Sequence, residues 1–140
     1  MIQKNDLVST VIMCIDYRFW PRTLFLLQEK YGLFDLVAIA GGAKNMVSPL
    51  SEEDKTTLLK NIEISIKLHN SKQLILLNHV DCGAYGGSKI FKMHAEELAF
   101  HKKELEQARK LAQEKFPTLT IKSFIVDKDD RDKISLVEIF

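Results

Sequence analysis

Two short segments of the chain carry the residue types best suited to chemistry. Residues 14–18 read Cys-x-Asp-x-Arg, and residues 79–83 read His-x-x-Cys-Gly. His79 and Cys82 are three positions apart, so one turn can present both side chains to the same point, and Gly83 lets the backbone bend tightly there. A cysteine from a neighbouring strand end completes a Cys2His set, which binds zinc in some catalytic sites and leaves a fourth position open. Thiolates with an imidazole favour zinc over magnesium or calcium.

Each of these residues also has an ordinary structural interpretation. A lone cysteine such as Cys14 is more typical of a small buried hydrophobe in a strand, and His79 can be a core histidine with satisfied hydrogen bonds. A redox pair of Cys14 and Cys82 is disfavoured, because there is no Cys-x-x-Cys motif and a histidine lies close to Cys82. The convergence of both segments on strand ends favours a metal site with Cys14, His79 and Cys82 as ligands.

Asp16 and Arg18 are the candidate catalytic residues. In an extended segment, residues two apart face the same side, so both point the same way as Cys14. Asp16 is predicted to accept a hydrogen bond beside the metal or to be its fourth ligand. Arg18 is predicted to hold Asp16 bidentately and keep it ionised. The alternative is a surface ion pair worth about 0–1 kcal/mol.

The candidate pocket residues are small. Gly41, Gly42 and Ala43 follow a predicted strand, where glycines permit close backbone approach. They are interpreted either as lining the same pocket or as a plain turn. Gly83, beside Cys82, is the fourth candidate.

The elements that position these residues follow from apolar runs and helical spacing. Buried strands are predicted over residues 8–15, 36–40, 73–77 and 119–126, and an extended segment over 134–140. Helices are predicted from Pro21 to about Gly32, from a capping Ser51 through Leu68, and over 92–116. This alternation predicts a single α/β domain over residues 1–140, with a mostly parallel sheet of four to five strands flanked by helices. Ligands bind such sheets beyond the carboxyl ends of strands.

Composition removes several function classes. The chain has 140 residues, 46% hydrophobic and 28% charged, and a formal net charge of +1. A near-neutral chain has no broad attraction for nucleic acid or anionic membranes, so neither is expected as a partner. No apolar run is long enough to span a membrane, and the start lacks the apolar core of a signal peptide, so we expect a cytoplasmic protein. His94 and His101, on the long helix, are expected to be solvated.

The two motifs together resemble those of the β-class carbonic anhydrases. The glycine-containing turn at Gly41–Gly42 falls where that family has its own glycine loop. The resemblance implies that Cys14, His79 and Cys82 bind zinc, and that zinc-bound hydroxide attacks CO2 to give bicarbonate reversibly. It implies that Asp16 orients the hydroxide and that Arg18 keeps Asp16 in place, although in some members the aspartate itself ligates zinc at rest. That family builds its sites at a dimer interface, so a homodimer or larger homo-oligomer is implied.

Two departures from that family keep other functions open. Tyr17 stands where a serine is common, and Ala40–Ala43 replaces a loop that often reads Arg-Asn-Ala-Gly. The first alternative is a hydrolase of CO2-like molecules such as carbonyl sulfide or carbon disulfide. The second is a non-catalytic zinc-binding homologue, against which the presence of Asp16 and Arg18 argues.

Overall fold

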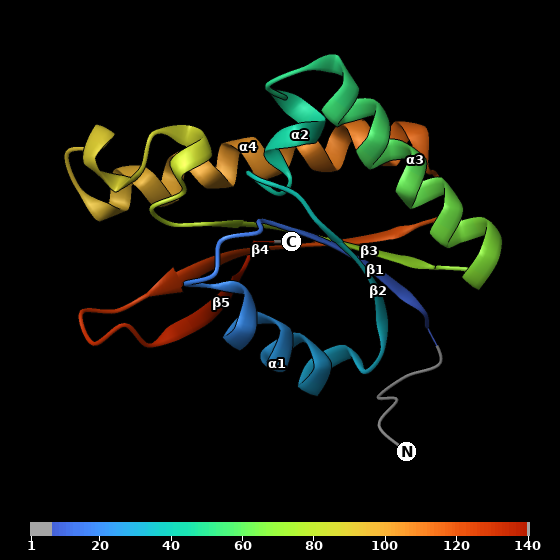
Figure 1. Ribbon diagram of the computed structural model, residues 1–140, viewed down its shortest axis with the longest axis horizontal. Coiled ribbons are helices and arrows are strands. Elements are labelled where there is room, and N and C mark those ends of the chain that lie inside the picture. The colour runs from blue at the N-terminus through green and yellow to red at the C-terminus, as the bar shows by residue number, and fades with distance from the viewer. Residues whose placement is uncertain (1–6, 140) are drawn as a thin grey trace.

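Five strands form the central sheet of the computed structural model, which describes residues 7–139 (Figure 1). Their order across the sheet is β2-β1-β3-β4-β5. The first four are parallel to one another, and β5 runs antiparallel to β4. The bounds are β1 Ser9–Met13, β2 Phe34–Ala38, β3 Gln73–His79, β4 Thr120–Lys128 and β5 Ile134–Glu138. The predicted α/β fold with a mostly parallel sheet is confirmed.

Helices cover both faces of this sheet (Figure 1). One face carries α1 (Trp20–Tyr31), and the other carries α2 (Lys44–Val47), α3 (Glu52–His69) and α4 (His94–Lys115). Two helices begin where the sequence predicts. Pro21 lies in the first turn of α1. At the start of α3, the Ser51 hydroxyl accepts a hydrogen bond from the Asp54 amide at 3.2 Å. None of the helices described in residues 7–139 has the length and apolar character needed to cross a bilayer.

The two central strands, β1 and β3, are the most deeply buried part of the sheet. Every residue of β1 and β3 is buried, because these strands have neighbours on both sides and helices on both faces. Since β1 and β3 are adjacent and parallel, their carboxyl ends reach the same edge of the sheet. The first loop residues after these two strands are therefore brought together.

Two predictions of burial are wrong. The strand predicted as buried over 36–40 is β2, and Leu36 in it is 44% exposed, because β2 lies at the end of the sheet order. His101, predicted to be solvated, is completely buried, because it lies on the side of α4 that packs against β3 and β4. The side chain of His94, in contrast, is 54% exposed.

Candidate metal centre

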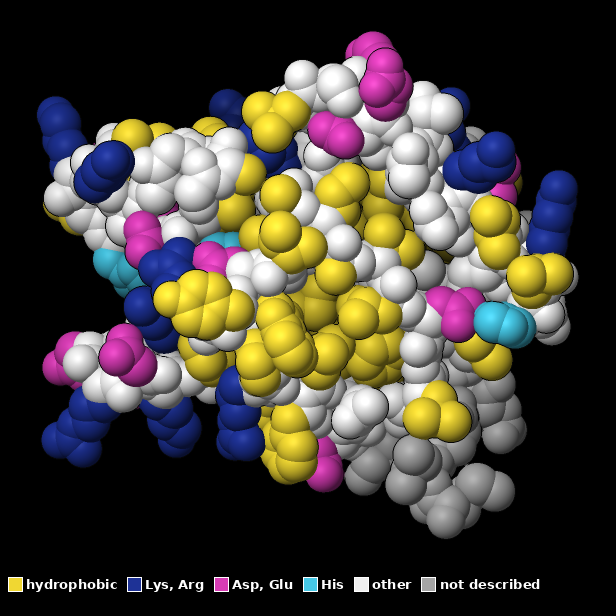
Figure 2. Space-filling view, viewed as in Figure 1, with side chains coloured by type: hydrophobic (Ala, Val, Ile, Leu, Met, Phe, Trp, Pro, Cys, Tyr) yellow, Lys and Arg dark blue, Asp and Glu magenta, His cyan; other side chains and the backbone are white. Residues whose placement is uncertain are grey.

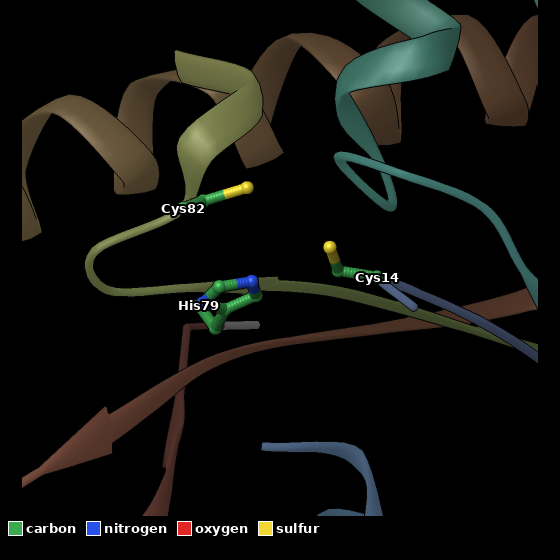
Figure 3. A group of neighbouring side chains, drawn as sticks. All are labelled: Cys14, His79 and Cys82. Carbon is green, nitrogen blue, oxygen red and sulfur yellow. The ribbon is translucent and has the colours of Figure 1, made fainter. Parts of the chain in front are cut away.

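Two adjacent strand ends bring a cysteine, a histidine and a second cysteine together. Cys14 directly follows β1, His79 is the last residue of β3, and Cys82 comes three residues later. Their ligand atoms all lie within 4.8 Å of one another, and Figure 3 shows the three side chains pointing toward a common space. Within residues 7–139 this is the one such group of three metal-ligating side chains. The geometry suits a metal ion, and that these residues bind zinc stays a prediction.

The imidazole of His79 is oriented for ligation. Its Nδ1 lies 2.6 Å from the carbonyl oxygen of Val80. Because a carbonyl only accepts, Nδ1 carries the proton, and Nε2 of the neutral ring keeps its lone pair. The ring of Phe19 stacks on the imidazole with centroids 4.3 Å apart, which fixes the ring plane.

The Nε2 atom of His79 gives a direct test of whether a metal fits. This atom is buried and has no hydrogen-bond partner among the described residues. A buried polar atom without a partner is costly, and a metal ion in the Cys14–Cys82 space would satisfy it. The donor set, two sulfurs and one imidazole nitrogen, matches the preferences of zinc.

The two cysteine thiols shift each other's pKa in opposite directions. A hydrogen bond from Cys82, with further contacts from His79 and the Gly41 amide, lowers the pKa of the Cys14 thiol to about 4 despite burial. The Gly41 N–H donates to Cys14 Sγ at 3.3 Å. The pKa of the Cys82 thiol is raised, first by its contact with Cys14 and then by burial. A divalent cation would stabilise both thiolates together.

Asp16 lies at the edge of this cluster and is held by Arg18. The Asp16 Oδ2 atom is 3.7 Å from His79 Nε2. Arg18 donates from Nε to Asp16 Oδ1 at 3.1 Å and from Nη2 to Oδ2 at 2.7 Å, which is the bidentate pairing expected from the sequence. The hydrogen bond from Arg18 lowers the pKa of the Asp16 carboxyl, so the group is ionised near neutral pH.

The candidate pocket residues occupy different positions. Gly41 contacts Cys14 through its amide, as described. Gly42 has φ +56° and lies so close to two strand ends that a Cβ there would be 2.6 Å from the Leu77 carbonyl oxygen. Ala43 is buried in the hydrophobic core. Gly83 borders a cavity of about 460 Å³ that is also lined by Arg18 and Asp81. Contact of these four residues with a substrate stays a prediction.

Asp81, Phe19 and Glu97 lie around the cluster but were not among the predicted site residues. Arg18 also donates from Nη1 to Asp81 Oδ2 at 2.8 Å, so a second carboxylate engages it. The position of Asp81 between two candidate ligands was a usable signal. Phe19 and the buried Glu97 gave none, because a phenylalanine beside a strand end and a glutamate in the first turn of a helix are ordinary residues there.

Comparisons with known proteins identify the family of the chain. The family model described as "Putative carbonic anhydrase" matches residues 4–138. An uncharacterized protein of Rickettsia conorii is 32% identical over 131 residues, covering 89% of this chain and 70% of the relative. An uncharacterized protein of Rickettsia bellii is 33% identical over 131 residues, covering 89% of this chain and 79% of the relative.

Solved structures share the fold at low sequence identity. A carbonic anhydrase from Glaciozyma antarctica has a TM-score of 0.62 at 18% identity, covering 94% of this chain and 81% of its own. A carbonic anhydrase from Streptococcus mutans has a TM-score of 0.59 at 17% identity, covering 92% of this chain and 80% of its own. A tetrameric beta-carbonic anhydrase from Sordaria macrospora has a TM-score of 0.58 at 17% identity, with 91% and 79% covered. At this identity the likeness concerns the fold.

Proposed function

Because the chain belongs to the carbonic anhydrase family whose model it matches, we propose that it is a zinc-dependent carbonate dehydratase that interconverts CO2 and bicarbonate. The observation that carries the proposal is the group of three ligand atoms within 4.8 Å of one another, beside a bidentate Asp16–Arg18 pair. A purely structural zinc site needs neither Asp16 nor Arg18. Their presence at the cluster therefore favours a catalytic site over a non-catalytic zinc-binding homologue.

Cys14, His79 and Cys82 would hold the zinc ion. When bound by three protein ligands, zinc lowers the pKa of water in its open position toward neutrality, which makes a nucleophile for CO2. The protein contributes the geometry of its own side chains. The Val80 carbonyl fixes the tautomer of His79, and the Gly41 amide directs the Cys14 sulfur into the cluster.

Asp16 is proposed to orient the reacting water. Its Oδ2 lies 3.7 Å from His79 Nε2, so it borders the space that the three ligands face. As an ionised carboxylate it only accepts hydrogen bonds, and it therefore turns the water's O–H toward itself and an oxygen lone pair toward CO2. Arg18 occupies both carboxylate oxygens, which keeps Asp16 charged and restrains it from moving onto the metal.

The substrate pocket is proposed at Gly41, Gly42, Ala43 and Gly83. CO2 is small and apolar, and no bulky side chain at these positions blocks its approach to the candidate ligands. The cavity that borders Gly83 opens beside Arg18 and supports access from this side.

We also propose that the chain forms a homo-oligomer through the β2 edge of the sheet. Apolar side chains around this edge, of which Ile15, Trp20 and Leu36 are well exposed, line a cavity of about 300 Å³: Met13, Ile15, Trp20, Leu24, Leu36 and Ala38. Figure 2 shows hydrophobic side chains gathered over the middle of this face. An apolar patch on an unpaired strand edge is typical of an interface, and the related Sordaria macrospora enzymes are described as tetrameric.

The proposed activity is tested by stopped-flow CO2 hydration at mildly alkaline pH, on protein whose zinc content has been measured. We expect turnover above the buffer rate and inhibition by a zinc-binding anion. Zinc-loaded protein with no rate above buffer would contradict the proposal. Release of sulfide from carbon disulfide by that same protein would then assign it to the hydrolases of CO2-like molecules, and no turnover of either would leave a zinc-binding homologue.

A further inference from the structure

We propose that Asp81 is a positioning residue that fixes Arg18, and through Arg18 the orientation of Asp16. Its consequence for turnover rests on the proposed function, whereas its effect on the Arg18 side chain does not. Asp81 makes hydrogen bonds to Arg18 and to Ser88 with its carboxylate and to Glu97 with its amide.

Arg18 is held by two carboxylates that come from two different strand ends. Nε and Nη2 donate to Asp16, which follows β1. Nη1 donates to Asp81 Oδ2 at 2.8 Å, and Nη2 also donates to the Asp81 backbone oxygen at 2.9 Å. Asp81 follows β3, so Arg18 connects the loops after both strands. The plane of the guanidinium is thereby fixed from two directions.

The Asp16–Arg18 pair alone would be a weak anchor. The Arg18 side chain is 37% exposed, and its partner is only two residues away in a loop. A single pair of this exposure contributes about 0–1 kcal/mol, and the pair with Asp81, whose side chain is also 37% exposed, adds a second contact from another loop. Contacts from Asp81 give Arg18 a position that does not depend on Asp16.

Asp81 is itself anchored on three sides. Its Oδ1 accepts from the Ser88 amide at 2.8 Å, and its own amide donates to Glu97 Oε2 at 2.7 Å. Glu97 is only 2% exposed, and its other oxygen accepts from the Ser88 hydroxyl at 2.7 Å. A Cβ at Gly87 would lie 3.1 Å from Asp81 Oδ1, so the loop packs closely against the carboxylate.

The backbone of Asp81 indicates that its side chain matters. Its φ is +56°, in the left-handed region that costs an ordinary residue about 1–2 kcal/mol and glycine nothing. An aspartate here keeps a carboxylate that a glycine would lack. That carboxylate binds Arg18 with one oxygen and Ser88 with the other, and these contacts offset the conformational cost.

Because glycine and asparagine both tolerate this backbone conformation, two variants can change the Asp81 side chain without straining the loop. Asp81→Gly preserves the left-handed conformation and removes the carboxylate. Asp81→Asn tolerates the same conformation and keeps an oxygen acceptor without the charge. The matched control is Asp132→Gly, because Asp132 has φ +61° and a side chain that is 83% exposed in the turn before β5.

The first measurement is independent of activity. In protein labelled with 15N-arginine, the Arg18 Nε–H signal, assigned by its loss in Arg18→Lys, reports how firmly the guanidinium is held. We expect its solvent exchange to accelerate about tenfold in Asp81→Gly and less in Asp81→Asn, with no change in Asp132→Gly. An unchanged Arg18 signal in Asp81→Gly would overturn the proposal, whether or not the protein hydrates CO2.

The second measurement links the anchor to turnover. At equal zinc content, CO2 hydration is expected to fall about tenfold in kcat in Asp81→Gly, with partial recovery in Asp81→Asn and no change in Asp132→Gly. Zinc loss in Asp81→Gly with an unchanged Arg18 signal would mean that Asp81 serves the metal loop instead, and would overturn the proposal. An altered Arg18 signal in a chain whose wild-type form never hydrates CO2 would leave the anchor supported and contradict the function.

Discussion

The Nε2 atom of His101 lies 3.8 Å from Glu97 Oε2, and both side chains are buried between α4 and the sheet. The Nδ1 atom of His101 accepts a hydrogen bond from Asn78 Nδ2 at 3.3 Å, so the ring is neutral and carries its proton on Nε2. Burial, with a smaller effect from His79, lowers the pKa of His101 to about 4, although Glu97 opposes this shift.

This histidine makes the folded state sensitive to acid. The unfolded chain binds a proton at His101 as the pH falls through about 6.5, and the folded chain does so only near pH 4, so stability is lost between these values as the pH falls. From pH 7 to pH 5, the free energy of unfolding is expected to fall by about 2 kcal/mol because of this group. In His101→Gln, denaturant unfolding should show a smaller fall in the free energy of unfolding between pH 7 and pH 5. His94→Gln, at an exposed position, should lose as much unfolding free energy as wild type. An equal loss in wild type, His101→Gln and His94→Gln would contradict the role assigned to His101.

Gly42 is predicted to be the glycine least tolerant of a side chain. A Cβ there would lie 2.6 Å from the Leu77 carbonyl oxygen, and the residue has φ +56°. Gly42→Ala is expected to lower the free energy of unfolding by about 2–5 kcal/mol, from overpacking and left-handed strain together. Gly83→Ala is the control, because a Cβ at Gly83 meets no atom within 4 Å. Equal unfolding midpoints for the two variants would show that the loop relaxes around Gly42.

The sequence predicted the sheet well where burial and propensity agree. β1 and β3 each contain a continuous apolar run, Val11–Met13 and Leu74–Leu77, so their existence and parallel pairing followed from short apolar runs between helices. β2 was predicted two residues late and as buried, since its apolar composition is that of a core strand although it lies at the end of the strand order. His101 was misjudged because spacing places it on a helix face but does not show which face packs on the sheet.

The candidate metal site was predictable because its residues are few and chemically distinctive. Cys14, His79 and Cys82 stand at strand ends, and parallel topology brings such ends together. The support around them was not predictable. Phe19 on the His79 ring and Glu97 on the Asp81 amide are tertiary contacts between ordinary residue types, and no local spacing specifies them.

Zinc content should depend on each of the three proposed ligands. His79→Gln and Cys82→Ser are each expected to reduce bound zinc, measured by elemental mass spectrometry after dialysis against a mild chelator, by tenfold or more. Each substitution leaves only two of the three proposed ligands, which bind zinc much more weakly. His94→Gln, which changes an exposed histidine, should retain the wild-type content. Full zinc in both His79→Gln and Cys82→Ser would contradict the proposed metal site.

The β2 edge should control assembly. Leu36→Lys introduces a charge into the exposed apolar surface and is expected to shift sedimentation from an oligomer to a monomer, because burying an unpaired charge opposes association. Leu68→Lys is the control, since Leu68 is 72% exposed near the end of α3 and does not line the β2 cavity. If wild type and Leu36→Lys sediment alike, the interface lies elsewhere.

Asp16 and Asp35 provide a matched test of the proposed catalytic carboxylate. Both have a lowered pKa, and both are ion-paired, Asp16 with Arg18 and Asp35 with His69. They lie at opposite ends of the parallel strands, because Asp16 follows the carboxyl end of β1 and Asp35 is near the amino end of β2. Asp16→Asn is expected to keep its zinc and to lose CO2 hydration about 100-fold, since the amide lacks the charge and presents donors beside the water it must orient.

Asp35→Asn should keep both zinc and turnover, although its stability will fall through the lost contacts with Ser65 and His69. The two variants therefore separate the loss of an ion-paired aspartate from the loss of one beside the metal. Arg18 in Asp16→Asn remains held by Asp81, so the guanidinium stays close while the carboxylate that it served is gone. Wild-type turnover in zinc-loaded Asp16→Asn would mean that the attacking water is oriented by another group, and would remove Asp16 from the proposed mechanism.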